Sequence, residues 1–140
     1  MEQEILNSYS RLNSLNVSRE TCLDFELFIS MIIDKNREIN IISKESSKNE
    51  VIRDRHIIDS AQIIDFIDLN CNTAVDLGSG GGMPGIIIAI MLKNMKKNVK
   101  VHLYEKSYHK SAFLREVSRK LKLKTKIFQE NVFDLKKLET

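Results

Sequence analysis

The chain of 140 residues is 42% hydrophobic and 29% charged, which suffices for one compact core and is too short for two full domains. No stretch approaches the about 18 consecutive apolar residues of a membrane span, and the acidic N-terminus argues against a secretory signal peptide. Cys22 and Cys71 lie far apart, without Cys or His partners at ligand spacing, which argues against a disulfide framework and a metal site. We therefore expect one cytoplasmic domain with no membrane or metal partner and with both thiols buried and reduced.

The modest net charge of +3 conceals an uneven distribution, because the basic residues are concentrated in one block. Residues 93–126 carry 12 Lys and Arg against 2 Asp and Glu, whereas residues 1–92 carry 8 against 14. Such a block favours a polyanion, because neutralising phosphates releases counterions. A lysine-rich solvated face is the commoner meaning of a charge run, so the block alone leaves nucleic acid open.

The first 70 residues are predicted to form a helical extension. Ile5, Tyr9 and Leu12 follow helical spacing, and a second helix, for which Ser18 is a candidate cap, has its own apolar face. That face consists of Leu23, Leu27, Phe28, Met31 and Ile32. A third helix is expected over roughly residues 50–66. The cations of this region that are candidates for phosphate contacts are Lys35, Arg37, Arg53 and Arg55.

Glycine placement is the most informative feature of residues 71–140. All five glycines and the only proline, Pro84, fall within residues 78–85. Residues 73–77 before them predict a buried parallel strand, and residues 86–92 after them predict a helix that is apolar on all sides, with Pro84 in its first turn. Glycines let a ligand lie against bare amides next to the positive helix N-terminus, so this strand, turn and helix predict a ligand site.

A second strand and helix follow. Residues 99–104 alternate as a strand, and Glu105 stands at its C-terminal end, where an acid is placed to accept both hydroxyls of a ribose. Ser107 is a candidate cap for the next helix, whose inward stripe is Phe113, Leu114, Val117 and Leu121. Residues 124–128 predict a third strand.

Two ligand classes fit this pattern. Gly80, Gly82 and Gly85 match G-x-G-x-x-G, and Glu105 lies 20 residues further on, as in dinucleotide-binding folds. The alternative frame, residues 76–82 (DLGSGGG), places Asp76 at the end of the first strand, facing the ligand. A carboxylate there repels a pyrophosphate but suits the ammonium and sulfonium groups of S-adenosylmethionine. We therefore favour the second ligand.

Three segments carry a family resemblance: residues 76–85 (DLGSGGGMPG), 105–114 (EKSYHKSAFL) and 55–60 (RHIIDS). In order and spacing they resemble the bacterial small-subunit (16S) ribosomal RNA guanine-N7 methyltransferases, also called the glucose-inhibited division protein B family. Residues 36–43 (NREINIIS) look like the family's asparagine-rich segment but depart from its usual N-L-T-A ending. The resemblance implies an α/β, Rossmann-like class I S-adenosylmethionine-dependent methyltransferase fold with an N-terminal helical extension.

The resemblance also implies positions for the cofactor. Gly78 and Met83 match positions against its methionine part, and Val132 and Phe133 match positions bordering the adenine, although Phe133 replaces an acid. The predicted cofactor-binding residues are therefore Asp76, Gly78, Gly80, Gly82, Met83, Glu105, Val132 and Phe133. His56 and Asp59 match the family's HxxDS motif. For them we favour a structural role over one in shaping the site.

The implied reaction is methyl transfer to guanine N7 in small-subunit ribosomal RNA or an assembling ribosomal particle. N7 is already nucleophilic, so no catalytic base is required and no catalytic residue is assigned. Basic residues 93–126 would hold the RNA backbone. Only three strands are predicted, so we expect an incomplete sheet. A NAD-type oxidoreductase and a non-catalytic RNA-binding remnant are the alternatives.

Overall fold

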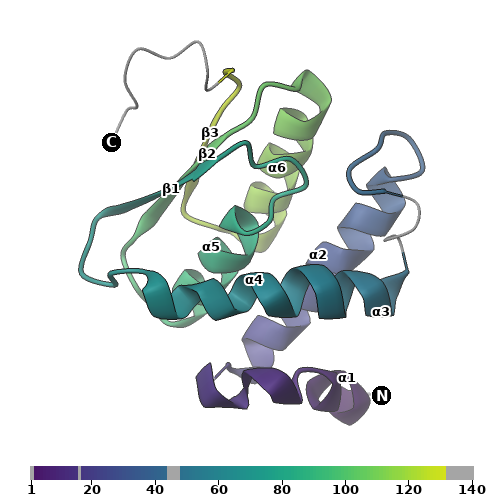
Figure 1. Cartoon of the computed structure of the whole chain (residues 1–140), viewed down its shortest axis with the longest axis vertical. Helices are drawn as coiled ribbons and strands as arrows, with labels where there is room; N and C mark the ends of the chain where they lie inside the picture. The colour runs from purple at the N-terminus through teal and green to yellow at the C-terminus, as the bar shows by residue number, and fades with distance from the viewer. Residues whose placement is uncertain (1, 16, 44–47, 132–140) are drawn as a thin grey trace.

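The computed structural model describes residues 2–15, 17–43 and 48–131. Its N-terminal half is helical and its C-terminal half alternates strands with helices (Figure 1). The helices before the sheet are α1 (Glu2–Ser8), η1 (Ser10–Leu15), α2 (Arg19–Lys35), α3 (Asn49–Val51), η3 (Ile52–Ile58), α4 (Asp59–Ala61) and η4 (Gln62–Phe66). The last four follow one another without a break, as α-, π-, α- and 3₁₀-helical turns, and so confirm the helix predicted over roughly residues 50–66.

The sheet has three parallel strands in the order β1 (Thr73–Leu77), β2 (Lys100–Tyr104) and β3 (Thr125–Phe128). Helices α5 (Gly85–Asn94) and α6 (Tyr108–Leu121) connect them. All three predicted strands are confirmed, with boundaries within one residue of those expected from the sequence. This arrangement is the Rossmann-like α/β fold that the family resemblance implied.

Helix α5 is the centre of the core. Every residue from Gly85 to Leu92 is buried, although a helix on a surface would show one polar face. One side of α5 packs on β2, while α2 and the helical segment of residues 59–66 pack on its other sides (Figure 1). The prediction of a helix that is apolar all round is therefore confirmed, because sheet and helices cover it completely.

The two faces of the sheet differ. Ala74, Val101 and Leu103 point to α5 and α6 and belong to the core. On the opposite face, Val75 and Leu77 are 39% and 49% exposed. The prediction that residues 73–77 form a fully buried strand is thus only half right, because β1 is an edge strand in the described part of the sheet.

Helix α6 follows its sequence signals closely. The Ser107 hydroxyl accepts a hydrogen bond from Lys110 N–H at 3.3 Å and so caps the helix as predicted. Its whole predicted apolar stripe is buried: Phe113, Leu114, Val117 and Leu121. The helix ends at Lys122, which adopts a left-handed conformation with φ 56°.

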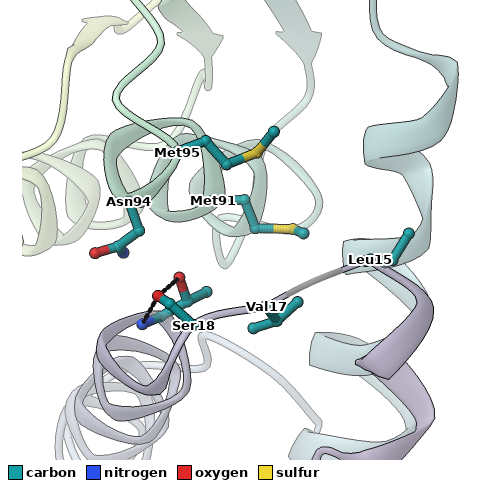
Figure 2. A pocket seen from close by; sticks show the side chains of 7 residues that line it. Leu15, Val17, Ser18, Met91, Asn94 and Met95 are labelled. Carbon is teal, nitrogen blue, oxygen red and sulfur yellow. Dashed lines mark hydrogen bonds between the residues drawn. The ribbon is translucent and has the colours of Figure 1, made fainter.

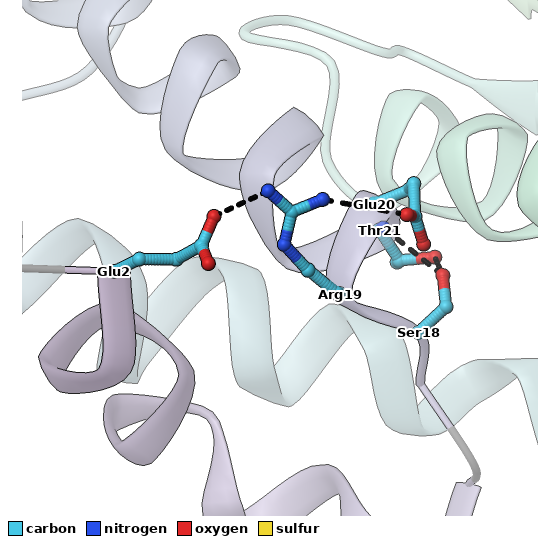
Figure 3. Close-up of polar contacts among 5 residues, drawn as sticks. All are labelled: Glu2, Ser18, Arg19, Glu20 and Thr21. Carbon is cyan, nitrogen blue, oxygen red and sulfur yellow. Dashed lines mark hydrogen bonds and ion pairs between the residues drawn. The ribbon is translucent and has the colours of Figure 1, made fainter.

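Polar contacts join the N-terminal helices to each other. Ser18 caps α2 by accepting from Thr21 N–H at 3.2 Å, as predicted, and Arg19 pairs with Glu2 of α1 at 2.5 Å (Figure 3). Cys22 on this helix is buried and Cys71 half-buried, and both are free thiols. Leu27, predicted on the apolar face of α2, is instead 38% exposed. No helix in the described ranges is both long and apolar enough to cross a membrane.

A partly buried ion pair fixes η3 against α2. Arg53 donates from Nε and Nη2 to the two oxygens of Glu26, at 3.1 and 2.7 Å, and its guanidinium lies over the Tyr9 ring. The Tyr9 hydroxyl also donates to Glu26, at 2.5 Å, and burial together with that carboxylate raises the pKa of Tyr9 well above its usual value. Arg53 therefore has a structural role through this ion pair, while its prediction as a phosphate contact stays a prediction.

We expect Arg53→Ala to lower the free energy of unfolding by about 2–4 kcal/mol, because it leaves the mostly buried Glu26 carboxylate without its cation. Arg11→Ala is the matched control. Its pair with Asp59 spans 3.7 Å between side chains that are 55% and 64% exposed, so it should cost under about 1 kcal/mol. Urea denaturation of both variants measures the difference, and equal losses would contradict the assignment.

Candidate functional site

The loops after β1 and β2 lie side by side at the carboxyl edge of the sheet. The register pairs Leu77 with Tyr104, so the residues that follow each strand emerge at the same level. The glycine loop, residues 78–85, follows β1, and Glu105 follows β2. Ser79 N–H donates to Tyr104 O at 2.9 Å and so ties the two loops together. In parallel sheets this edge is where ligands bind.

Glu105 joins both loops through its carboxylate. One oxygen accepts from Gly80 N–H at 2.9 Å, and the other accepts from Ser107 N–H at 2.6 Å. The side chain is buried, at 7% exposure, and its backbone carbonyl accepts from the Ser111 hydroxyl at 3.0 Å. These bonds hold a negative charge at a fixed position beside the glycine loop.

The Asp76 side chain connects the end of β1 to the start of α5 across the glycine loop. Its Oδ2 accepts from Gly85 N–H, the first residue of α5, at 3.0 Å. Burial raises the pKa of the Asp76 carboxyl above its usual value, although hydrogen bonds with Gly85 and Ser79 oppose this effect. The ionised carboxylate stands near the positive end of α5, which favours its charge. The sequence placed Asp76 at the site but did not predict this capping bond.

The glycines serve two different purposes. A Cβ on Gly85 would lie 2.2 Å from Leu103 Cδ2 and 2.5 Å from Asp76 Oδ2, so α5 approaches the sheet only because Gly85 has no side chain. A Cβ on Gly78 would meet nothing within 4 Å, while its φ of +70° favours glycine. Gly85 is therefore a packing glycine, whereas Gly78 borders open space.

The remaining predicted cofactor residues divide into two groups. Gly80, Gly82 and Met83 lie in the glycine loop, where Gly82 N–H donates to Ser79 O at 2.7 Å and the Met83 side chain packs on the core. Val132 and Phe133 lie outside the described residues. The structure thus brings together Asp76, Gly78, Gly80, Gly82, Met83 and Glu105.

Comparisons with known proteins agree with this geometry. Residues 21–140 match the family model of the rRNA small subunit methyltransferase G. The chain belongs to this family. A relative from Pelagibacter ubique, named "Ribosomal RNA small subunit methyltransferase G", is 63% identical over 99% of this chain and 65% of its own length. Relatives of the same name from Bartonella henselae and a Jannaschia species are 40% and 37% identical, over 96% and 85% of this chain.

The chain spans less than two thirds of the length of these relatives: 65%, 62% and 56%. The family match confirms the resemblance that residues 55–60, 76–85 and 105–114 carry. The fold is accordingly the class I methyltransferase type of the methyltransferase G family, with the N-terminal helices packed behind it. Methyltransferases of this fold draw in general on S-adenosylmethionine as methyl donor.

Residues of the family's HxxDS segment make none of the hydrogen bonds described above for the glycine loop and Glu105. Asp59 pairs with Arg11 of η1 in a solvent-exposed contact. His56 lies in the π-helical turn η3, and its Nε2 is buried with no hydrogen-bond partner in the described structure. The structural role that we favoured for both residues remains a prediction.

Three hollows lined by described residues lie away from the glycine loop. One of about 130 Å³ lies between the start of α2 and the C-terminal end of α5, lined by residues such as Val17, Met91 and Met95 (Figure 2). Because α5 has ten residues, this hollow is about 15 Å from the helix start where Gly85 lies. It is therefore separate from the glycine-loop site.

Two further hollows, of about 310 and 460 Å³, adjoin at the amino edge of the sheet. They share Asn98 and Lys124 in their linings. Neither is lined by Asp or Glu, and the Lys residues around them are Lys93, Lys96, Lys97, Lys100, Lys122 and Lys124. We call this group the basal lysine surface. Among the described residues no group of three or more His, Cys, Asp or Glu could hold a metal ion.

The two kinds of glycine predict different costs. Gly85→Ala should destabilise the protein by about 2–4 kcal/mol, because its methyl group overlaps Leu103 and Asp76 and the packed core resists displacement. Gly78→Ala should cost about 1 kcal/mol, the strain of a left-handed alanine, because open space receives the methyl group. Thermal unfolding of the two variants measures both. A Gly78→Ala variant as unstable as Gly85→Ala would contradict the distinction.

Proposed function

We propose that this chain holds the cofactor site of an S-adenosylmethionine-dependent enzyme that methylates guanine N7 in small-subunit ribosomal RNA. The observation that carries the proposal is the open backbone at Gly78, flanked by the two carboxylates of Asp76 and Glu105. Family membership and the names of the relatives support it. The ribosome is assembled in the cytoplasm, which is where we place the protein.

The residues fit a cationic ligand better than an anionic one. S-adenosylmethionine carries a sulfonium and an ammonium group, and a pyrophosphate carries two negative charges. Asp76 and Glu105 present negative charge on both sides of the glycine loop, in partly buried surroundings where solvent screens poorly. This charge favours the methyl donor over a nicotinamide dinucleotide, the alternative ligand of the G-x-G-x-x-G pattern.

Glu105 is suited to the ribose of that donor. An ionised carboxylate has about four acceptor positions, and the two backbone N–H groups of Gly80 and Ser107 use two of them. The other two are available to a pair of neighbouring hydroxyls. Because the carboxylate is held at both oxygens, a ligand would find it already in place, which lowers the entropy cost of binding.

The bound cofactor would supply an activated methyl group, which the lone pair of guanine N7 displaces from sulfur. Since N7 carries no proton to remove, the protein needs no catalytic base. Its task is to position the methyl donor against guanine N7 and to exclude water. Asp76 and Glu105 hold the donor, and the glycine loop admits it close to the backbone. The target base must be exposed or unstacked to reach this pocket.

The basic block supports RNA as the substrate, and the fold divides it into two surfaces. One is the basal lysine surface, where Lys96, Lys97 and Lys122 are exposed around a hollow without acidic lining. The other is the outer face of α6, with exposed Arg115 and Arg119. A folded RNA is large enough to contact both surfaces. In this proposal they hold phosphates, and the glycine-loop site holds the cofactor.

We expect isothermal titration calorimetry to detect S-adenosylmethionine binding, and Asp76→Asn to weaken it about tenfold or more. The asparagine keeps an oxygen for Gly85 N–H but loses the charge, which near a partly buried cation is worth roughly 1.4 kcal/mol or more. Gly78→Ala should abolish binding, because its methyl group enters the ligand's space. Asp65→Asn, on an exposed acid, is the control. Binding of NADH instead of S-adenosylmethionine would favour the oxidoreductase alternative.

The same titration should depend on pH. Burial raises the pKa of Asp76, so this carboxyl takes up its proton above the usual range of aspartate and then no longer attracts a cation. Affinity should therefore fall as the pH is lowered through that raised pKa, while Asp76→Asn loses this dependence. Identical pH profiles for the two proteins would show that Asp76 does not face the donor.

For the RNA we expect the basal lysine surface to contribute to salt-dependent binding. The variant Lys96→Gln/Lys97→Gln/Lys122→Gln/Lys124→Gln should reduce the slope of log affinity against log salt by roughly 0.7 for each phosphate that the protein no longer neutralises. The probe is a small-subunit ribosomal RNA transcript in filter binding. A control, Arg11→Gln/Arg19→Gln, removes exposed cations of the N-terminal helices and should leave the slope nearly unchanged. An unchanged slope in the lysine variant would show a merely solvated surface.

A further inference from the structure

We infer that Asn36 is a positioning residue, which holds residues 39–42 against the glycine loop and so shapes the cofactor site from the N-terminal helices. Asn36 follows the last turn of α2. Its side-chain Oδ1 accepts from Ile41 N–H at 2.8 Å and from Ile42 N–H at 3.0 Å. The inference rests on the proposed function, since it concerns the same site.

The side chain of Asn36 acts on this segment and not on the helix that it follows. The C-terminal cap of α2 is made by the Asn36 backbone N–H, which donates to Ile32 O at 2.8 Å. The side chain accepts both hydrogen bonds from backbone N–H groups. The atom that faces these groups must therefore be the amide oxygen and not the amide nitrogen. Its removal leaves α2 capped and deprives Ile41 and Ile42 of this acceptor.

The held segment contacts the glycine loop at Gly81. A Cβ on Gly81 would lie 3.0 Å from Ile41 Cγ2, 3.3 Å from Ile41 O and 3.5 Å from Ile42 Cγ2. Ile41 is itself buried, at 5% exposure, and belongs to the core. The segment is therefore a wall against which the backbone of the loop rests. Ile41 N–H also donates to Ile39 O at 3.0 Å, while Asn36 Oδ1 is the acceptor that ties both Ile41 and Ile42 to the end of α2.

The wall meets the glycine loop between two residues whose backbone N–H groups make hydrogen bonds of their own. Gly80 N–H donates to Glu105, and Gly82 N–H donates to Ser79 O. Gly81, between them, is fixed by contact with Ile41 and Ile42. Loosening the wall allows the loop to sample other conformations, and a ligand that needs one of them binds more weakly in proportion to the fall in its population.

The test compares Asn36→Ala with Asn36→Asp, which keeps an acceptor oxygen. We expect Asn36→Ala to weaken S-adenosylmethionine binding about tenfold, since it removes two part-buried hydrogen bonds to backbone N–H groups. It should also increase the hydrogen-exchange rates of the Gly80 and Gly82 amides. Asn36→Asp should restore both properties. Asn13→Ala, an exposed asparagine of η1 outside this segment, is the matched control and should behave as the unaltered chain.

Each outcome decides the inference. Unchanged exchange at Gly80 and Gly82 in Asn36→Ala would overturn it, as would failure of Asn36→Asp to restore the original rates. Faster exchange throughout the chain, with an equal fall in melting temperature, would show only a general structural role and would also overturn it. If the unaltered protein binds no S-adenosylmethionine, the proposed function fails, while the exchange rates still test whether Asn36 positions the loop.

Discussion

The hydrogen bond from Gly85 N–H to Asp76 Oδ2 determines how the rest of the site is built. It draws the start of α5 so close to the end of β1 that position 85 has no room for a Cβ. Burial raises the pKa of the Asp76 carboxyl, whereas this hydrogen bond and the positive end of α5 favour its ionised form. This one hydrogen bond therefore fixes both the path of the glycine loop and the position of the Asp76 carboxylate next to it.

The N-terminal helices are connected to this core by buried and half-buried polar contacts as well as by apolar packing. Besides the Glu26–Arg53 pair, Asp24 of α2 pairs with Lys93 of α5 at 2.6 Å, and Lys93 also donates to Leu121 O at the end of α6. A displaced α2 would leave these charges buried without partners, which is costly. The helical extension is thus held in one orientation, and a contact such as that of Asn36 can act on the loop.

Much of the fold could be predicted from the sequence because local rules and tertiary structure agree in α5 and α6. Each local signal there predicts one structure: the clustered glycines predict a tight turn, the apolar run after them a buried helix, and Ser107 a helix start. The capping role of Asp76 and the wall at Ile41 could not be predicted, since both join residues that are distant in sequence. The sequence signal at Asn36 was its place at the start of residues 36–43, which look like the family's asparagine-rich segment, and that likeness does not show which backbone groups its side chain binds. The structural role of Arg53 could not be predicted either, because sequence alone does not show that Glu26 lies opposite it.

The basic block shows how folding changes the meaning of a charge pattern. Along the sequence, residues 93–126 form one continuous basic stretch. In the structure, Lys93 of the basal lysine surface pairs with Asp24, and most of the other cations lie on that surface or on the outer face of α6, while Lys106 follows β2 and Lys126 lies in β3. The glycine-loop site is at the opposite edge of the strands, about 15 Å from the basal lysine surface. In the proposed function both cationic surfaces bind phosphates of one RNA, because a folded nucleic acid is large enough to contact surfaces on different parts of the domain and a small phosphorylated substrate is not.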